Sequence, residues 1–268
     1  MRKKLQGAAK ALEEVVDRAG QELERSCGAI RFQELPNLHF ADVILGLLAR
    51  QYQLWVVAIL SPAVSTAPVA PLILRALADA TITIAWLSAN PESAQQYKRY
   101  SAGRLKLLME HWKARETPEA REFVADYADQ LTEIVDAEQW AGILPVELGS
   151  WNGKDIRSMA VETGLKDIYD LVYSPMSSEA HGEWIPLKQR FMRPCAEALH
   201  PTHWLPALER PYRITNFPPA ATALFVKSLE IALGALDTSH RADFWDELQE
   251  KVCTIAGEIE ESQAAGQP

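Results

Sequence analysis

The stretch Ala70–Asn90, APLILRALADATITIAWLSAN, decides the fold class of this chain. Apart from Arg75 and Asp79, it offers only apolar or small residues on every side of a helix. A helix that is hydrophobic all round belongs inside a bundle, with other helices on each face. A charge inside such a helix needs a partner, because an unpaired buried charge is very costly. We therefore expect a central helix that carries Arg75 and Asp79 in a buried or semi-buried polar site.

The segments around this helix are patterned as further helices. Helix-forming residues dominate the 268-residue chain, and no run shows the strict apolar–polar alternation of a half-buried strand. Asn90–Pro91 and Thr117–Pro118 are helix start signals, and Gly182 is a stop signal. Pro175 is expected to kink a helix or start a new turn, with Ser174 as its cap. The expected helices cover residues 6–26, 38–60, 70–89, 91–115, 118–139, 218–236 and 242–262, with shorter pieces between 155 and 182.

These elements predict an all-α protein, a helical bundle of about seven or eight helices that forms one structural unit. Residues 1–37 provide an N-terminal amphipathic helix, and residues 38–184 form the core bundle. Residues 185–268 hold a long Pro-rich loop and two C-terminal helices that pack on the bundle. The loop, residues 185–219, is expected to be irregular and to lie over one end of the bundle.

The composition bears on the binding partners and the cellular compartment of the protein. The net charge of −9 disfavours adhesion to nucleic acid through global charge. Three cysteines, odd in number and far apart, fit a reducing compartment. The N-terminus lacks the apolar core of a signal peptide. Residues 51–74 are uncharged over a length that could cross a bilayer, but Pro62, Pro68 and Pro71 interrupt them. We expect a cytoplasmic protein without a membrane span.

Two groups of residues could carry chemistry. Arg75 and Asp79 are four residues apart and share a helix face, so they form either part of a polar site or a structural ion pair that fixes helix register. His181 follows Ser177 by four residues, with Glu179 between them. An imidazole there could act as a general acid or base, or could simply cap the helix that ends at Gly182.

The Pro-rich loop offers two further possibilities. Its basic residues, among them Arg190 and Arg193, could hold an anionic ligand if the loop acts as a lid, whereas its aromatic residues could simply anchor a packed loop. His200 and His203, with Cys195 nearby, have a spacing that suggests zinc, but no second ligand pair accompanies them. We therefore expect no metal and no cofactor.

The quoted helix and the later segment YSPMSSEAHGEW together resemble a family of uncharacterised bacterial helical proteins, domain of unknown function 5677. The resemblance covers about residues 40–185. The family shows an arginine and an acidic residue one turn apart on an apolar helix, then an aromatic-rich helix, and later a Tyr, a Ser and a His-Gly pair. The matching positions are Arg75, Asp79, Tyr97, Tyr100, Tyr173, Ser177 and His181.

The resemblance implies no agreed activity. A looser similarity links the family to helical domains of prokaryotic defence and toxin systems, some of which cleave RNA with an arginine shortly before a histidine. That signature is absent here, because the nearest arginine upstream of His181 is Arg157.

Three functions remain open. The first is a non-catalytic interaction or effector component of a defence or toxin-type system, which binds a protein partner or itself. The second is a metal-independent ribonuclease in which His181 is the acid or base, Arg75 stabilises a phosphate, Tyr173 and Ser177 position RNA, and Glu179 assists. The third is a sensor of a small anionic ligand, with Asp79, Arg190 and Arg193 at its binding site and residues 185–216 as its lid.

Overall fold

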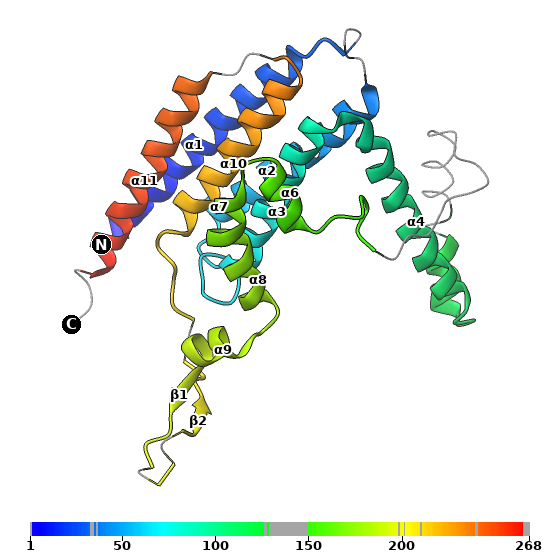
Figure 1. Ribbon diagram of the computed structural model, residues 1–268. Coiled ribbons are helices and arrows are strands. Elements are labelled where there is room, and N and C mark those ends of the chain that lie inside the picture. The colour runs from blue at the N-terminus through cyan, green and yellow to red at the C-terminus, as the bar shows by residue number, and fades with distance from the viewer. Residues whose placement is uncertain are drawn as a thin grey trace.

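The computed structural model describes residues 2–32, 35, 37–125, 128, 149–197, 199–200, 202–209, 211–238 and 241–264. The fold is all-α, as predicted, apart from one small two-stranded sheet. Five long helices form the bundle in Figure 1: α1 (Arg2–Gly28), α2 (Leu38–Leu60), α3 (Ala70–Ala89), α10 (Phe217–Ala235) and α11 (Ala242–Ala264).

The helix that decides the fold class lies at the centre of the molecule, as expected. α3 packs against α2, α10, α6 and α8. Its residues 80–87 are all buried. Asn37 caps the start of α2, because its Oδ1 accepts a hydrogen bond from the Phe40 amide at 3.1 Å. The bounds of α2 and α3 are the predicted ones.

α2 and α3 are also long and apolar enough to cross a membrane by length and composition alone. Most of the apolar window of α3, and a smaller share of that of α2, is buried inside the fold. Packing against the other bundle helices therefore accounts for much of their apolar composition.

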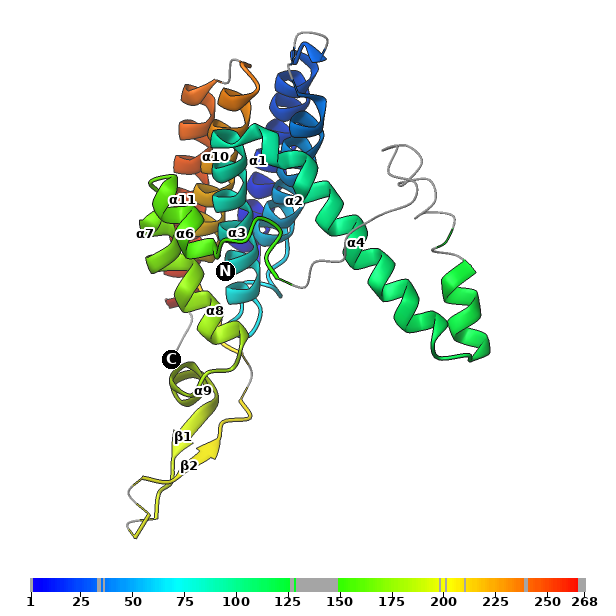
Figure 2. The same ribbon diagram turned by 45° about the vertical axis from the view of Figure 1, so that its right-hand side comes forward.

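The middle of the chain forms shorter elements. A 3₁₀ turn, η2 (Pro91–Ser93), leads into α4 (Ala94–Lys113), which extends away from the bundle in Figure 2. Residues 118–125 are helical. The rest of the helix predicted to reach residue 139, except Ala128, lies outside the described residues, as do the first nine residues of the loop predicted at 140–154. Besides residues 118–125, the described residues hold ten α-helices, more than the seven or eight expected, because the region after residue 155 is divided into several short ones.

Those short helices form a chain across the face of α3. They are α6 (Ile156–Glu162), α7 (Lys166–Ile168), the π-helical turn η3 (Tyr169–Tyr173) and α8 (Ser174–Ala180). From residue 166 to 180 the backbone is continuously helical. The π turn ends two residues before Pro175, which has no amide hydrogen and would clash with the Leu171 carbonyl in a regular α-helix.

The cap predicted for this helix was wrong, whereas its stop was right. Ser174 makes no side-chain cap, because the helix runs through it instead of starting there. At the other end Gly182 takes the left-handed conformation, with φ of 65°. The Glu183 amide donates to the Ser178 carbonyl at 3.0 Å, and the Gly182 amide donates to the Glu179 carbonyl at 3.2 Å. These two bonds form the Schellman motif that closes a helix.

The Pro-rich segment is more ordered than expected. It contains α9 (Trp184–Phe191) and a hairpin of β1 (Met192–Pro194) and β2 (Trp204–Pro206). We call residues 184–213 the arm, because Figures 1 and 2 show them extending away from the bundle and not lying over its end. The base of the arm is held by backbone hydrogen bonds from Ala67 to Tyr212 (3.1 Å) and from Ile214 to Ser65 (2.7 Å).

Candidate functional site

The polar residues of α3 meet residues from three other elements. The Arg75 guanidinium lies over the Tyr173 ring, 5.7 Å from its centroid, which brings η3 onto α3. The Nε atom of Arg75 is buried and has no hydrogen-bond partner in the described part of the chain. We call Arg50, Arg75, Asp79, Tyr97 and Tyr173 the α3 cluster.

The Asp79 side chain is reached by solvent, but nearby protein atoms partly desolvate its carboxyl. Its side chain is exposed and not buried as expected, yet desolvation by the neighbouring protein raises the pKa of its carboxyl above the ordinary value. The charges of Arg75 and Arg50 and a hydrogen bond from Thr83 act in the opposite direction but do not outweigh desolvation. Asp79 is therefore an accessible carboxyl that holds its proton more firmly than usual.

Tyr97 completes the cluster from α4. Burial, followed by the nearby charge of Asp79, raises the pKa of its phenol, so the phenol stays a hydrogen-bond donor. Its ring packs edge-on against Trp151, with centroids 5.0 Å apart, and Trp151 packs in the same way against Trp86 at 5.3 Å. The Trp86 indole donates to Glu162 on α6 at 2.8 Å. These contacts fix one side of the cluster.

The ion pair considered between Arg75 and Asp79 does not form. Both residues lie in the described part of the chain, and no ion pair joins them there, although the charge of Arg75 does lower the pKa of Asp79. The cluster thus places two guanidinium groups, a carboxyl and two phenols near one another. Groups of these types can bind a small polar molecule and exchange a proton with it.

The raised pKa of Asp79 predicts a pH-dependent effect of Asp79→Asn. The folded state favours the protonated carboxyl, so the contribution of Asp79 to stability is complete below its ordinary pKa of 3.8 and is lost as pH rises through the folded pKa. We expect the asparagine variant to be more stable than the original at pH 7, by less than about 1 kcal/mol because solvent reaches the carboxyl. Urea unfolding at pH 7 and at pH 3.5 measures this difference.

The matched control is Asp246→Asn, which changes an exposed carboxyl on α11. We expect the advantage of Asp79→Asn to disappear at the lower pH. A loss of stability in Asp79→Asn at pH 7 would mean that attraction to Arg75 and Arg50 exceeds desolvation, and would contradict the raised pKa.

Glu179 and Arg190 bind each other and leave little for a ligand. An Arg190 amino group donates to the Glu179 carboxylate at 2.6 Å, and its other amino group donates to the Tyr212 hydroxyl at 2.7 Å. This contact ties α8 to α9 and to the base of the arm. Both residues therefore position α8 relative to α9 and the arm, and the catalytic role predicted for Glu179 and the ligand-binding role predicted for Arg190 stay predictions.

His181 stands apart from the α3 cluster. It is the exposed C-cap of α8, and its amide donates to the Ser177 carbonyl at 3.0 Å. Its imidazole makes no hydrogen bond or ion pair with any residue that the structure describes. Eight residues separate it from Tyr173, about 12 Å along a helix.

Of the candidate residues, the structure thus groups Arg75, Asp79 and Tyr173. Ser177 is half-buried on α8, and Arg193 is exposed on β1.

Sequence reasoning missed Arg50 as a member of the cluster. The available signal was that Arg50 is, after Asp42, the second charged residue of an otherwise apolar helix. Periodicity places it on α2 but cannot show which face of α3 it meets, because that depends on the crossing angle of the two helices.

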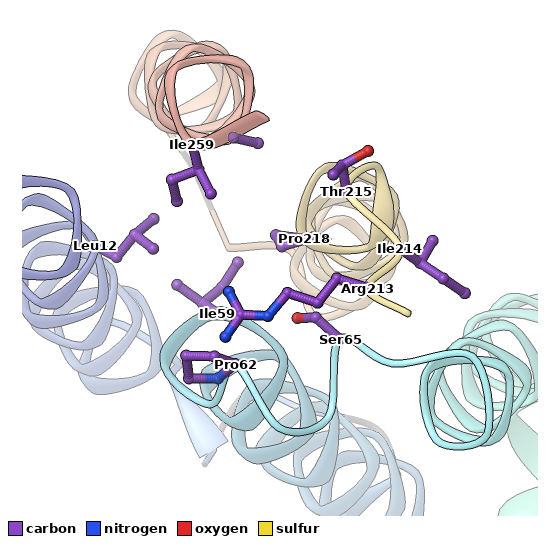
Figure 3. Close-up of a pocket in the computed structure, with 10 residues that line it drawn as sticks. Leu12, Ile59, Pro62, Ser65, Arg213, Ile214, Thr215, Pro218 and Ile259 are labelled. Carbon is purple, nitrogen blue, oxygen red and sulfur yellow. The ribbon is translucent and has the colours of Figure 1, made fainter. Parts of the chain in front are cut away.

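A cavity of about 80 Å³ lies away from the cluster, between α1, α2, α10 and α11. Its lining is mostly apolar, and the Arg213 guanidinium extends across it in Figure 3. A drug-sized ligand needs several hundred Å³. None of the candidate site residues lines this cavity.

Comparison with known proteins gives one result. No curated protein and no solved structure matches the chain. The model of a family of unknown function, DUF5677, matches residues 41–197. All five residues of the α3 cluster fall within this match, as do Ser177 and His181. The match confirms the resemblance expected over residues 40–185, and the chain belongs to this family of unknown function, DUF5677.

Proposed function

We propose that the protein is a non-catalytic interaction protein whose arm binds a second copy of the chain. The observation that carries this proposal is the exposure of large apolar side chains on the arm. Leu199 is 85% exposed and Leu208 is 90% exposed, and Trp184, Ile185 and Tyr212 are exposed as well. Apolar side chains gathered on a projecting element are typical of a surface that another protein covers.

Charge favours a second copy as the occupant. The sequence of the arm holds five basic and two acidic residues, a net charge of +3, whereas the whole chain carries −9. The remainder of each copy is therefore strongly acidic, with a net charge of −12. Opposite charges on the two contacting surfaces speed association and orient it.

The geometry supports the two alternatives less well. A ribonuclease built on His181 and Arg75 needs both groups at one phosphate, yet Arg75 packs on Tyr173 and His181 caps the far end of α8. A sensor with the arm as lid needs the arm over its ligand. The arm extends away from the bundle instead, and Arg190 is engaged by Glu179.

Sedimentation velocity over a range of protein concentrations tests the proposal. We expect the wild-type protein to form a dimer that weakens as salt is raised. The double variant Leu199→Ser with Leu208→Ser should dissociate, with Kd at least about tenfold higher, because each buried leucine contributes about 1.5 to 3 kcal/mol. At protein concentrations low enough for both proteins to be monomeric, its thermal stability should equal that of the wild type, because both side chains are exposed in the monomer.

The matched control is Leu72→Ser with Val161→Ser, which removes two exposed apolar side chains from α3 and α6. This variant should remain a dimer. A wild-type protein that stays monomeric at every concentration would overturn the proposal, and so would equal dissociation in both double variants.

The ribonuclease alternative has its own decisive experiment. End-labelled tRNA and structured RNAs are incubated without added metal with the wild-type protein, His181→Ala and Arg75→Ala. Because His181 is exposed and unpartnered in the described structure, His181→Ala should fold normally. Cleavage by the wild-type protein that is lost in both folded variants would contradict our proposal and show that the protein is a nuclease. We expect no cleavage by any of them.

The cellular setting belongs to the same proposal. A cytoplasmic location is consistent with three cysteines that are all free in the structure. α2 and α3 serve as core helices and not as membrane spans. A role in a prokaryotic defence or toxin-type system is supported by the looser family resemblance alone.

A further inference from the structure

The hairpin of the arm brings together residues that are eight positions apart in the sequence. β1 and β2 are antiparallel, and their last paired rung joins Pro194 to Trp204. Cys195 and His203 form the next rung, where the Cys195 amide donates to the His203 carbonyl at 2.9 Å. Side chains of directly opposed residues start about 4.5 to 5.5 Å apart. Strand pairing therefore places a thiol beside an imidazole.

A turn adds a second imidazole to this pair. The His200 amide donates to the Glu197 carbonyl at 3.0 Å, and the His203 amide donates to the His200 carbonyl at 3.1 Å. The two imidazole rings meet edge to face, with centroids 5.7 Å apart. As a result, one ligand atom each from Cys195, His200 and His203 lies within 4.8 Å of the other two.

We propose that Cys195, His200 and His203 form a zinc-binding site. A thiolate with two imidazoles is a ligand set that suits Zn²⁺, whereas Mg²⁺ and Ca²⁺ require oxygen ligands. Zinc bonds of about 2.0 to 2.3 Å in a tetrahedron place the ligand atoms roughly 3.5 Å apart. Both imidazoles are exposed, so their rings can turn to shorten the separations from the present limit of 4.8 Å to this value. With three ligands from the protein, the fourth position is open to water.

The arm has a physical need for such a site. A two-stranded hairpin is only marginally stable in water, and the strands here have three residues each with partly or fully exposed side chains. Leu199, the largest apolar side chain between Cys195 and His203, is almost fully exposed, so it packs into no core there. Binding of metal to residues that the unfolded chain does not hold together adds directly to folding free energy. Zinc would stabilise the hairpin where side-chain packing does not.

This inference departs from the sequence-based expectation of no metal, which rested on the missing second ligand pair. The hairpin adds a third ligand by pairing Cys195 with His203, so the site needs no second pair. The inference does not depend on dimer formation, because all three ligands come from one chain.

Zinc titration of the full-length, untagged protein tests the site. Chelator-treated protein is titrated with Zn²⁺ in competition with a chromophoric chelator, beside Cys195→Ser and His203→Ala. We expect one Zn²⁺ per chain. Because loss of even an outer-shell partner weakens a metal site about 10- to 100-fold, each variant should weaken binding by at least about 100-fold. The control is Cys253→Ser, which removes an exposed thiol on α11 and should bind as the wild type does.

Two measurements on the unmodified protein make the test independent of variant folding. Co²⁺ should give the visible bands of a tetrahedral site and a thiolate charge-transfer band. Zn²⁺ should also protect Cys195 from alkylation, as judged by peptide mass spectrometry, while Cys253 reacts at an unchanged rate. Failure to bind stoichiometric Zn²⁺ would overturn the site. So would binding that Cys195→Ser leaves unchanged, or alkylation of Cys195 at the same rate with and without Zn²⁺.

Discussion

Replacing Trp55 with alanine should destabilise the protein by about 3 to 5 kcal/mol, because the change removes a large side chain from the centre of the bundle. Trp55 is 0% exposed. Its ring stacks on Phe225 of α10, with centroids 5.0 Å apart, and its indole donates to the Thr222 hydroxyl at 2.9 Å. One side chain therefore joins α2 to α10 by packing and by a hydrogen bond.

Urea unfolding followed by far-UV circular dichroism measures the loss. The control is Trp184→Ala on the arm, where the ring is 55% exposed. At a protein concentration low enough for the chain to be monomeric, we expect it to change stability by no more than about 0.5 kcal/mol. Trp55→Phe separates the two contributions. Thr222 also donates to the Pro218 carbonyl at 2.9 Å, so its hydroxyl keeps a partner and the phenylalanine variant should lose much less than the alanine variant. Equal losses in the two tryptophan-to-alanine variants would contradict a core centred on Trp55.

The core helices were predictable because their signals are local. The uniform apolar character of residues 70–89 and the punctuation at Pro62, Pro71 and Pro91 set the bounds of the central helices without any knowledge of their neighbours. The arm was not predictable in the same way. Its strands have three residues each, too few to show a period of two, and its prolines read as irregular structure.

The candidate sites were also predictable only where the signal is local in the sequence. The family resemblance identified Arg75, Asp79 and Tyr173, which the structure brings together, but it also included His181, which the structure places at an exposed helix end. Spacing along the sequence cannot show which faces meet across elements. For the same reason the zinc pattern of the arm looked incomplete until strand pairing placed Cys195 beside His203.

A second large effect is expected from Gln51→Glu, because Gln51 is the donor in a fully buried polar network. Its amide nitrogen lies within hydrogen-bond distance of three oxygens: the Leu77 carbonyl (2.9 Å), the Thr81 hydroxyl (3.1 Å) and the Ser228 hydroxyl (2.6 Å). The two hydroxyls donate along their own helices, Thr81 to Leu77 at 2.8 Å and Ser228 to Leu224 at 2.9 Å. The two hydroxyls also lie 2.8 Å from each other, where either can be the donor. Each hydroxyl has a single hydrogen for these contacts, so the Gln51 amide supplies donors that the network otherwise lacks.

A carboxylate at position 51 would face the Leu77 carbonyl without a proton to give. The Thr81 and Ser228 hydroxyls could donate to it only by giving up the carbonyls of their own helices. Burial of such an unpaired charge is expected to cost about 3 kcal/mol or more at pH 7, measured by urea unfolding. The pKa of the new carboxyl must rise, because only its protonated form can donate. The cost should therefore be present above the folded pKa and shrink as pH falls, which a change of shape alone would not do.

Gln53→Glu provides the matched control, since the same substitution two residues later lies on the exposed face of α2. We expect that variant to change stability by less than about 0.5 kcal/mol at any pH. Gln51→Met removes the donor without adding a charge, so its loss should be smaller than that of Gln51→Glu and independent of pH. If Gln51→Glu were as stable as Gln53→Glu at pH 7, water or another donor would have to reach position 51. The bundle would then lack the closed polar centre through which α2, α3 and α10 hold one register.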